Sequence, residues 1–131
     1  MATLKVGLVS PEREVWAGEA RSVVAQTVEG QLGILPNHAP VLGVLLDGSV
    51  VKIEPADGGE PVTAMVGSGF FSIADNEVSI LAEQAELGTE VDVAEARQAL
   101  EAVLAGGGEG EEASTLERRA RARLRAAGAD A

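Results

Sequence analysis

The hydrophobic pattern of this chain of 131 residues changes its period once, shortly after Glu86. Before that point, apolar and polar residues alternate in short runs, as at Leu4, Val6 and Leu8. A period of two residues is typical of a half-buried β-strand. After that point, apolar residues recur every three or four positions, which is the period of an amphipathic helix. The change therefore predicts an all-β part followed by an all-helical part.

Turn signals divide the first part into short strands. Asp47-Gly48 lies between the apolar runs 41–46 and 49–53, and an Asp-Gly pair in that position predicts a tight hairpin. Further turn signals lie at 55–61 and 75–76. Short strands with turns every 8–12 residues or so are typical of an antiparallel β-sandwich or flattened barrel. We therefore predict an α+β fold that begins with such a sandwich.

The second part is predicted to be a two-helix antiparallel hairpin. We assign residues 1–87 to the sandwich and residues 88–131 to the hairpin, with helices at about 93–104 and 115–127 and a Gly- and Glu-rich linker at 105–113. The second helix has a narrow apolar stripe, and its length is near the roughly 12–15 residues below which isolated helices are marginal in water. We expect a weakly held element that can detach.

Capping signals support these helix positions. Asp92 with Glu95, and Ser114 with Glu117, have the spacing of capping boxes, in which an N-cap side chain and an acid three residues later satisfy free backbone amides. Gly128 is a candidate for the C-terminal end of the second helix.

Aromatic residues are scarce, so the core must consist of Val, Leu, Ile and Ala. The only aromatic side chains are Trp16, Phe70 and Phe71, and we expect them mainly in the core. Adjacent residues of a strand point to opposite faces, which leaves one of the two phenylalanines for an interface. The absence of cysteine excludes disulfides and thiolate zinc sites.

The charge distribution points to an acidic protein with one basic end. The net charge is −11, which argues against general nucleic-acid binding. Residues 114–131 instead carry a net charge of +3. Two interpretations stay open: a solvated helix face, or a docking site for an acidic surface on the chain itself or on a partner. The basic residues are Arg118, Arg119, Arg121, Arg123 and Arg125.

Motifs for chemistry are weak. His38 is the only histidine and lies in Leu-Pro-Asn-His-Ala-Pro at 35–40, which is typical of a rigid turn or an interface and lacks an identifiable catalytic partner. The glycines at 106–110 lack the lysine of a phosphate-binding loop, so we interpret them as a linker. We predict no catalytic residue, no metal site and no cofactor. The longest uncharged run, 30–46, contains two prolines, so we expect a soluble chain without a membrane span.

The segment 29–40, Glu-Gly-Gln-Leu-Gly-Ile-Leu-Pro-Asn-His-Ala-Pro, resembles the signature of the epsilon subunit of bacterial rotary F-type ATP synthases. Further segments also match in order and spacing, as do the two capped helices at the end, and the resemblance spans nearly the whole chain. These segments are 4–10, Gly-Ser-Gly-Phe-Phe at 67–71, 78–82 and Ala85-Glu86.

The resemblance implies a non-catalytic subunit of the central stalk that keeps proton translocation coupled to ATP synthesis. Its implied partners are the gamma subunit, the ring of c subunits and the alpha/beta catalytic hexamer, without nucleic acid. Membrane association would be indirect, through the c ring, at the cytoplasmic face of the plasma membrane. The family's contacts with the c ring map onto Gly30, Gln31 and Leu32, and those with gamma onto Pro36, Asn37, His38, Ala39 and Pro40.

The resemblance also implies a hairpin with a compact state against the sandwich and an extended state along gamma. In the extended state, the five arginines of the second helix would meet an acidic segment of a catalytic subunit and inhibit ATP hydrolysis.

Some family members bind ATP through an Ile-Asp-x-x-Arg-Ala pattern preceded by a glutamate. Here Glu86 and Asp92 are present, but Glu95 stands where the arginine would be. Because a carboxylate repels phosphates, and because a capping box explains Glu95 without a ligand, we predict no ATP binding. The alternative function is a nucleotide-sensing or adaptor β-sandwich module of the same fold.

Overall fold

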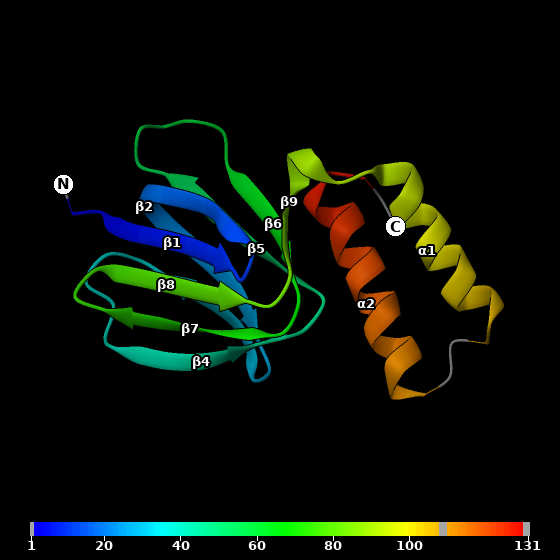
Figure 1. The fold of residues 1–131 in the computed structure, drawn as a ribbon. Coiled ribbons are helices and arrows are strands. Elements are labelled where there is room, and N and C mark those ends of the chain that lie inside the picture. Colours follow the sequence, from blue (N-terminus) through cyan, green and yellow to red (C-terminus); the bar gives the residue numbers. More distant parts are fainter. Residues whose placement is uncertain (1, 108–109, 130–131) are drawn as a thin grey trace.

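The computed structural model describes residues 2–107 and 110–129, and it contains two parts that lie side by side (Figure 1). The N-terminal part is a β-sandwich that ends with β9 (Ala85–Leu87) and the short 3-10 helix η1 (Gly88–Glu90). Two antiparallel helices follow, and α2 lies between the sandwich and α1. The predicted α+β fold, a sandwich followed by a helical hairpin, is confirmed.

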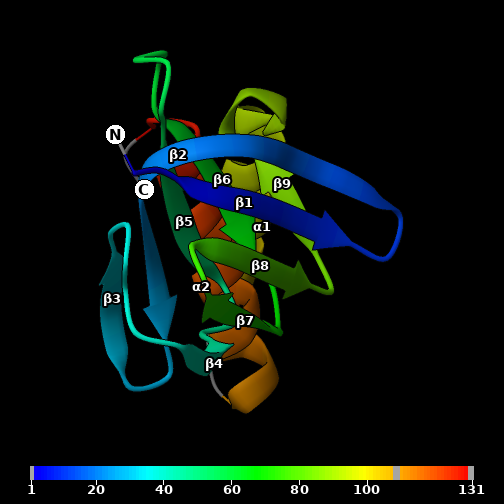
Figure 2. The ribbon, with the colours of Figure 1, turned by 90° about the vertical axis from the view of Figure 1, so that its left-hand side faces the viewer.

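The described strands form one sheet that folds over on itself (Figure 2). Hydrogen-bonded neighbours run in the order β1-β8-β7-β4-β2-β5-β6-β9, with β3 beside β2 and β1 also pairing with β2. Because β2 pairs with β1 as well as with β4, the path of paired strands returns to its start, and the sheet closes into a flattened barrel. The other strands are β1 (Leu4–Ser10), β2 (Arg13–Thr27), β3 (Gly30–Ile34), β4 (Val41–Leu45), β5 (Ser49–Pro55), β6 (Val62–Val66), β7 (Gly69–Ala74) and β8 (Glu77–Ala82).

One strand pair departs from the expected antiparallel arrangement. β1 and β8 run parallel, with Val6 opposite Val78, whereas the other recorded pairings are antiparallel. Parallel neighbours need a long connection between them, which the strands from β2 to β7 supply here.

The predicted hairpin at Asp47-Gly48 is wrong. β4 and β5 flank this dipeptide but do not pair with each other, since β4 pairs with β7 and β2, and β5 pairs with β2 and β6. The turn is a corner at which the chain passes between layers, with Gly48 at a φ of 79°. An Asp-Gly dipeptide specifies a tight turn but not the partners of the strands beside it. The turn at Asp75-Asn76 does join paired strands, β7 and β8.

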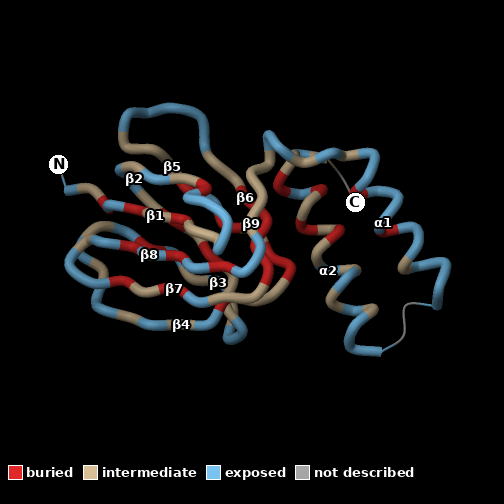
Figure 3. Tube along the Cα trace, viewed as in Figure 1, coloured by how far each residue is buried: buried red, intermediate tan, exposed pale blue. Residues whose placement is uncertain are grey.

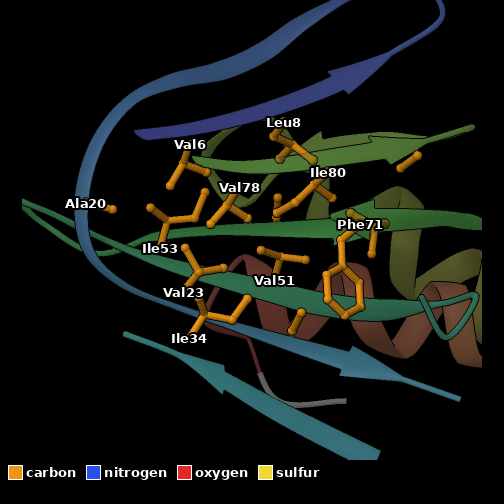
Figure 4. Packing of buried hydrophobic residues seen from close by; sticks show 14 of the residues in the cluster. Val6, Leu8, Ala20, Val23, Ile34, Val51, Ile53, Phe71, Val78 and Ile80 are labelled. Carbon is orange, nitrogen blue, oxygen red and sulfur yellow. The ribbon is translucent and has the colours of Figure 1, made fainter. Parts of the chain in front are cut away.

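Branched aliphatic side chains fill the sandwich, as the composition predicts (Figure 4). Leu4, Val6 and Leu8 of β1 are all buried in this core. The two phenylalanines of β7 divide as predicted: Phe71 is 1% exposed, whereas Phe70 is 49% exposed on the outer face.

The first helix, α1 (Val93–Ala105), begins where the capping signal predicts. Asp92 is its N-cap, and the Asp92 carboxylate accepts a hydrogen bond from the Glu95 backbone amide at 3.1 Å.

The second helix, α2 (Glu111–Ala126), begins about four residues earlier than expected, with Gly110 as its N-cap. The predicted capping box at Ser114 is therefore wrong, because Ser114 lies inside the helix and Glu117 pairs with Arg121. Glu111 and Glu112 explain the earlier start, since acidic side chains in a first turn complement the positive end of the helix dipole.

The end of α2 agrees with the sequence. Gly128 follows the C-cap Ala127 and has a φ of 79°. Its amide donates to the Arg125 carbonyl at 3.0 Å, and the Ala129 amide donates to the Leu124 carbonyl at 2.8 Å. This pair of hydrogen bonds is a Schellman motif, which glycine favours at the left-handed position.

Helix α2 is buried on two sides (Figure 3). Ala120 and Leu124 pack against Ala96 and Leu100 of α1. The opposite side packs on the sandwich through Ala122 and Ala126, which cluster with Met65. Small side chains on both sides let a single helix approach two neighbours closely.

Candidate interaction surfaces

An ion pair between Arg119 and Asp47 joins α2 to the sandwich. Arg119 donates from Nε to Oδ1 at 2.8 Å and from Nη2 to Oδ2 at 2.9 Å. The neighbouring Arg118 donates from Nε to the Asp47 carbonyl at 3.1 Å. The hydrogen bond from Arg119 is the main cause that lowers the pKa of Asp47 below its ordinary value, so the carboxylate stays ionised.

A second ion pair joins Arg123 to Glu86 of β9. Arg123 donates from Nε to Oε1 at 2.7 Å and from Nη2 to Oε2 at 3.3 Å. Its Nη1 also lies 3.4 Å from a carboxylate oxygen of Glu95 on α1. Arg123 therefore ties α2 to both of its neighbours, and Glu86 raises the pKa of Arg123. We call Asp47–Arg119 and Glu86–Arg123 the junction ion pairs.

Arg121 and Arg125 of α2 take no part in these pairs. Arg121 donates to Glu117 of the same helix at 2.9 Å, and Arg125 is exposed. The basic residues thus divide into members that pair with acidic groups of the sandwich and members that do not. Each of the two open interpretations from the sequence fits part of the set.

Two glycines let the backbone of α2 approach the sandwich. A Cβ atom on Gly48 would lie 2.8 Å from the Arg119 amide nitrogen, and one on Gly88 would lie 2.0 Å from the Ala126 carbonyl oxygen. Beside Gly88, the Thr63 hydroxyl donates to the same Ala126 carbonyl at 2.6 Å. Docking of α2 therefore depends on having glycine at these two positions as well as on charge.

The two residues named for a doubted ATP site lie in different surroundings. Glu86 lines a cavity of about 540 Å³ between the hairpin and the sandwich, together with Arg119 and Arg123. Asp92 is not among the lining residues and acts as the N-cap of α1. Glu95, which prompted the prediction against ATP, contacts Arg123 of that lining.

The residues predicted to contact partners lie at opposite ends of β3. Gly30, Gln31 and Leu32 follow the turn after β2, and Gln31 pairs with Gln26. The segment 36–40 follows the other end of the strand, so the structure does not bring the two sets into one patch.

The segment 36–40 begins with a well-fixed turn. The His38 amide donates to the Leu35 carbonyl at 3.2 Å, and Asn37 has a φ of 69°. Pro36 followed by Asn at positive φ matches a type II turn. Asn76 accepts a 2.6 Å hydrogen bond from the Asn37 amide, and the His38 Nδ1 lies 2.7 Å from the Ala39 carbonyl oxygen. The predicted rigid turn is confirmed.

An exposed apolar row crosses the outer face of the sandwich, and sequence reasoning missed most of it. Val44, Phe70 and Leu81 lie opposite one another on β4, β7 and β8, with Val9 of β1 at the end of the row. Val44 is 55% exposed and Leu81 is 42% exposed. The sequence did contain a signal for it, because the strand 41–45 lacks polar residues on either face. A strand with one solvated face normally alternates between hydrophobic and polar residues. We call these four residues the apolar row.

No helix within residues 2–107 and 110–129 is long and apolar enough to cross a membrane. The same stretches contain no group of three or more His, Asp or Glu side chains that could hold a metal ion.

The β-sandwich matches a known family of protein domains. Residues 3–88 match the model of the family "ATP synthase, Delta/Epsilon chain, beta-sandwich domain". The chain belongs to the ATP synthase epsilon chain family, whose members are central-stalk subunits of F-type ATP synthase.

Curated relatives match over nearly their full length. The ATP synthase epsilon chain of Streptomyces coelicolor is 50% identical over 126 residues, which cover 96% of each chain. That of Thermobifida fusca is 49% identical over 97% of this chain and 93% of the relative. The fold is also similar to a chain in the Euglena gracilis mitochondrial ATP synthase, with a TM-score of 0.73, 21% identity, and coverage of 95% of this chain and 76% of that one.

Proposed function

We propose that this chain is a non-catalytic rotor subunit that carries a releasable brake on ATP hydrolysis. The sandwich, residues 1–87, would bind gamma and rest on the c ring, which keeps proton translocation coupled to ATP synthesis. The hairpin, residues 88–131, would leave the sandwich and inhibit the alpha/beta hexamer. The subunit would sit at the cytoplasmic face of the plasma membrane, held there through the c ring. A nucleotide-sensing or adaptor module of the same fold stays as the alternative.

Two features support the gamma contact. The apolar row presents a contiguous hydrophobic surface across four strands, and such surfaces mark protein interfaces. The turn at 36–40, fixed by Asn76, offers rigid polar groups including His38. We assign Pro36, Asn37, His38, Ala39 and Pro40, together with the apolar row, to gamma.

The turn after β2 suits a contact with the c ring. Gly30, Gln31 and Leu32 begin β3 at a projecting hairpin, and Gln31 is exposed. An uncharged polar side chain at a hairpin end can contact a rotating ring without needing a charged partner at one position of that ring.

The observation that carries the brake is the use of α2 arginines by the sandwich itself. In the compact state, Asp47 and Glu86 occupy Arg119 and Arg123. An acidic segment of a catalytic subunit would compete for those guanidinium groups and for Arg118, Arg121 and Arg125. Compact and inhibiting states then compete, because the guanidinium donors that Asp47 and Glu86 hold have to be released before a partner's carboxylates can bind them.

Removal of residues 88–131 tests this proposal in the assembled ATP synthase. We expect a complex that still contains gamma and the truncated subunit, couples proton flow to synthesis, and hydrolyses ATP faster than the complex with the full chain. Unchanged hydrolysis in a correctly assembled complex would refute the brake. Failure to assemble with gamma would favour the adaptor alternative.

A further inference from the structure

We propose that a groove between α2 and the sandwich binds a small multivalent phosphate anion, such as inorganic phosphate or pyrophosphate. The groove has a volume of about 320 Å³ and is lined by Arg118, Arg121 and Arg125 on one side and by Gln26 and Ser49 on the other. We call it the arginine groove. The net charge of the chain is −11, yet none of the described residues that line this groove is acidic.

The three arginines share one face of α2 and have donors to offer. Their spacing of three and four residues places them on successive helix turns. Arg121 uses Nε on Glu117, whereas Arg118 uses Nε and Nη2 on the Asp47 carbonyl and on Thr115. The Arg125 side chain makes no hydrogen bond or ion pair with any residue that the structure describes. Planar guanidinium groups bind phosphate oxygens through paired hydrogen bonds, so three arginines that line one groove favour this ligand.

The groove is separate from the cavity beside Glu86. Positions 119 and 123 line that cavity, whereas positions 121 and 125 line the groove. Two positions along a helix differ by about 200°, so the two sites lie on opposite sides of α2. The volume is at the low end of the roughly 300–1,000 Å³ found for small-molecule sites, which favours a compact oxyanion.

Binding in the arginine groove would be linked to the hairpin. Gln26 and Ser49 belong to the sandwich and the arginines to α2, so the groove exists only while α2 is docked. A ligand that binds one state and not the other shifts the equilibrium toward the state it binds. Phosphate would therefore hold the hairpin in its compact state, a consequence that rests on the proposed brake, whereas the binding itself does not.

The test is a nuclear magnetic resonance titration of the isolated full chain with sodium phosphate and sodium pyrophosphate, against sodium chloride at equal ionic strength. We expect saturable shifts at the Gln26 and Ser49 amides, with pyrophosphate tighter than phosphate. Arg125→Gln, and Arg121→Gln with Arg125→Gln, should weaken binding about tenfold or more, because each removes charge-assisted hydrogen bonds. The matched control Arg97→Gln, at an exposed position on α1, should bind like the parent.

Several results would overturn the proposal. Equal shifts with sodium chloride would show that ionic strength alone, and not phosphate binding, causes them. Shifts centred on Glu86 and Val103 would place the anion in the other cavity, and equal weakening by Arg97→Gln would show general attraction. Binding of ATP without binding of pyrophosphate, or binding of poly-glutamate without either anion, would identify a different ligand. None of these outcomes depends on ATP hydrolysis, so the binding and the brake fail separately.

Discussion

The Asp47 carboxylate and the Arg119 guanidinium face each other across the junction of sandwich and hairpin, with 2.8 Å between Oδ1 and Nε. The two side chains are 23% and 28% exposed, so solvent screens the pair. A partly exposed ion pair contributes about 1 kcal/mol or less. Moving the hairpin almost completely between two states takes about 5.5 kcal/mol of differential binding. The two junction ion pairs together fall well short of that figure, so a partner with a larger differential binding energy can displace them.

Asp47→Asn should open the hairpin more often. The substitution removes the charge that faces Arg119 while keeping the shape of the side chain. We expect α2 amides to exchange with solvent up to about fivefold faster, as a loss of about 1 kcal/mol implies. Amide hydrogen exchange followed residue by residue measures this change.

Glu117→Gln is the matched control for that variant. It also removes one carboxylate facing an α2 arginine, but its partner Arg121 lies in the same helix. We expect little change in docking. Equal acceleration by both variants would mean that net charge, not the junction, sets the exchange rate.

Acid should release the hairpin through Asp47. Arg119 lowers the pKa of Asp47 in the folded chain, so this group contributes stability above the ordinary aspartate pKa. That contribution is lost as pH falls from there through the lowered pKa. We expect docking of α2 to weaken below about pH 4, and Asp47→Asn to flatten the dependence. An Asp47 carboxylate that titrates at its ordinary pKa in a carbon-detected titration would contradict this account.

Gly88→Ala should undock the end of α2 without disturbing the sandwich. The added methyl group would lie 2.0 Å from the Ala126 carbonyl oxygen, so the helix has to move and the Thr63 hydrogen bond is lost. We expect a loss of roughly 1–3 kcal/mol in docking, read from exchange of the α2 amides. Gly7→Ala, where a Cβ meets nothing within 4 Å, is the control and should leave docking unchanged.

Phe70→Ser should weaken gamma binding with little effect on folding. Phe70 is half exposed at the centre of the apolar row, and a central aromatic side chain commonly contributes more than about 1 kcal/mol to an interface. Calorimetry with purified gamma should show at least about fivefold weaker binding. Phe71→Ala, one residue on, should instead cost about 3–5 kcal/mol of unfolding free energy. Undiminished gamma binding by the Phe70 variant would remove the apolar row from that interface.

Local patterns predicted the elements better than their partners. The alternation at Leu4, Val6 and Leu8 fixed a strand and its buried face, and Asp92 and Gly128 marked real helix ends. The hairpin at Asp47-Gly48 was wrong because strand pairing depends on the rest of the sheet. A dipeptide carries no information about which distant strands pair with the two strands beside it.

The arginines illustrate the same limit at the candidate site. Their spacing showed one basic helix, but only the fold shows that Arg119 and Arg123 meet Asp47 and Glu86 from distant segments. The helix start was predicted late because Ser114 has capping spacing inside a segment already made helical. A capping pattern is a local preference that the upstream acidic turn overrides.

The rate of ATP hydrolysis by the assembled enzyme containing Asp47→Asn tests the central claim most directly. If the sandwich and the catalytic subunits compete for the α2 arginines, this variant should hydrolyse ATP more slowly than the parent complex, by up to about fivefold. The complex with Glu117→Gln should match the parent. Hydrolysis that is unchanged or faster with Asp47→Asn would contradict the competition between the two acidic partners.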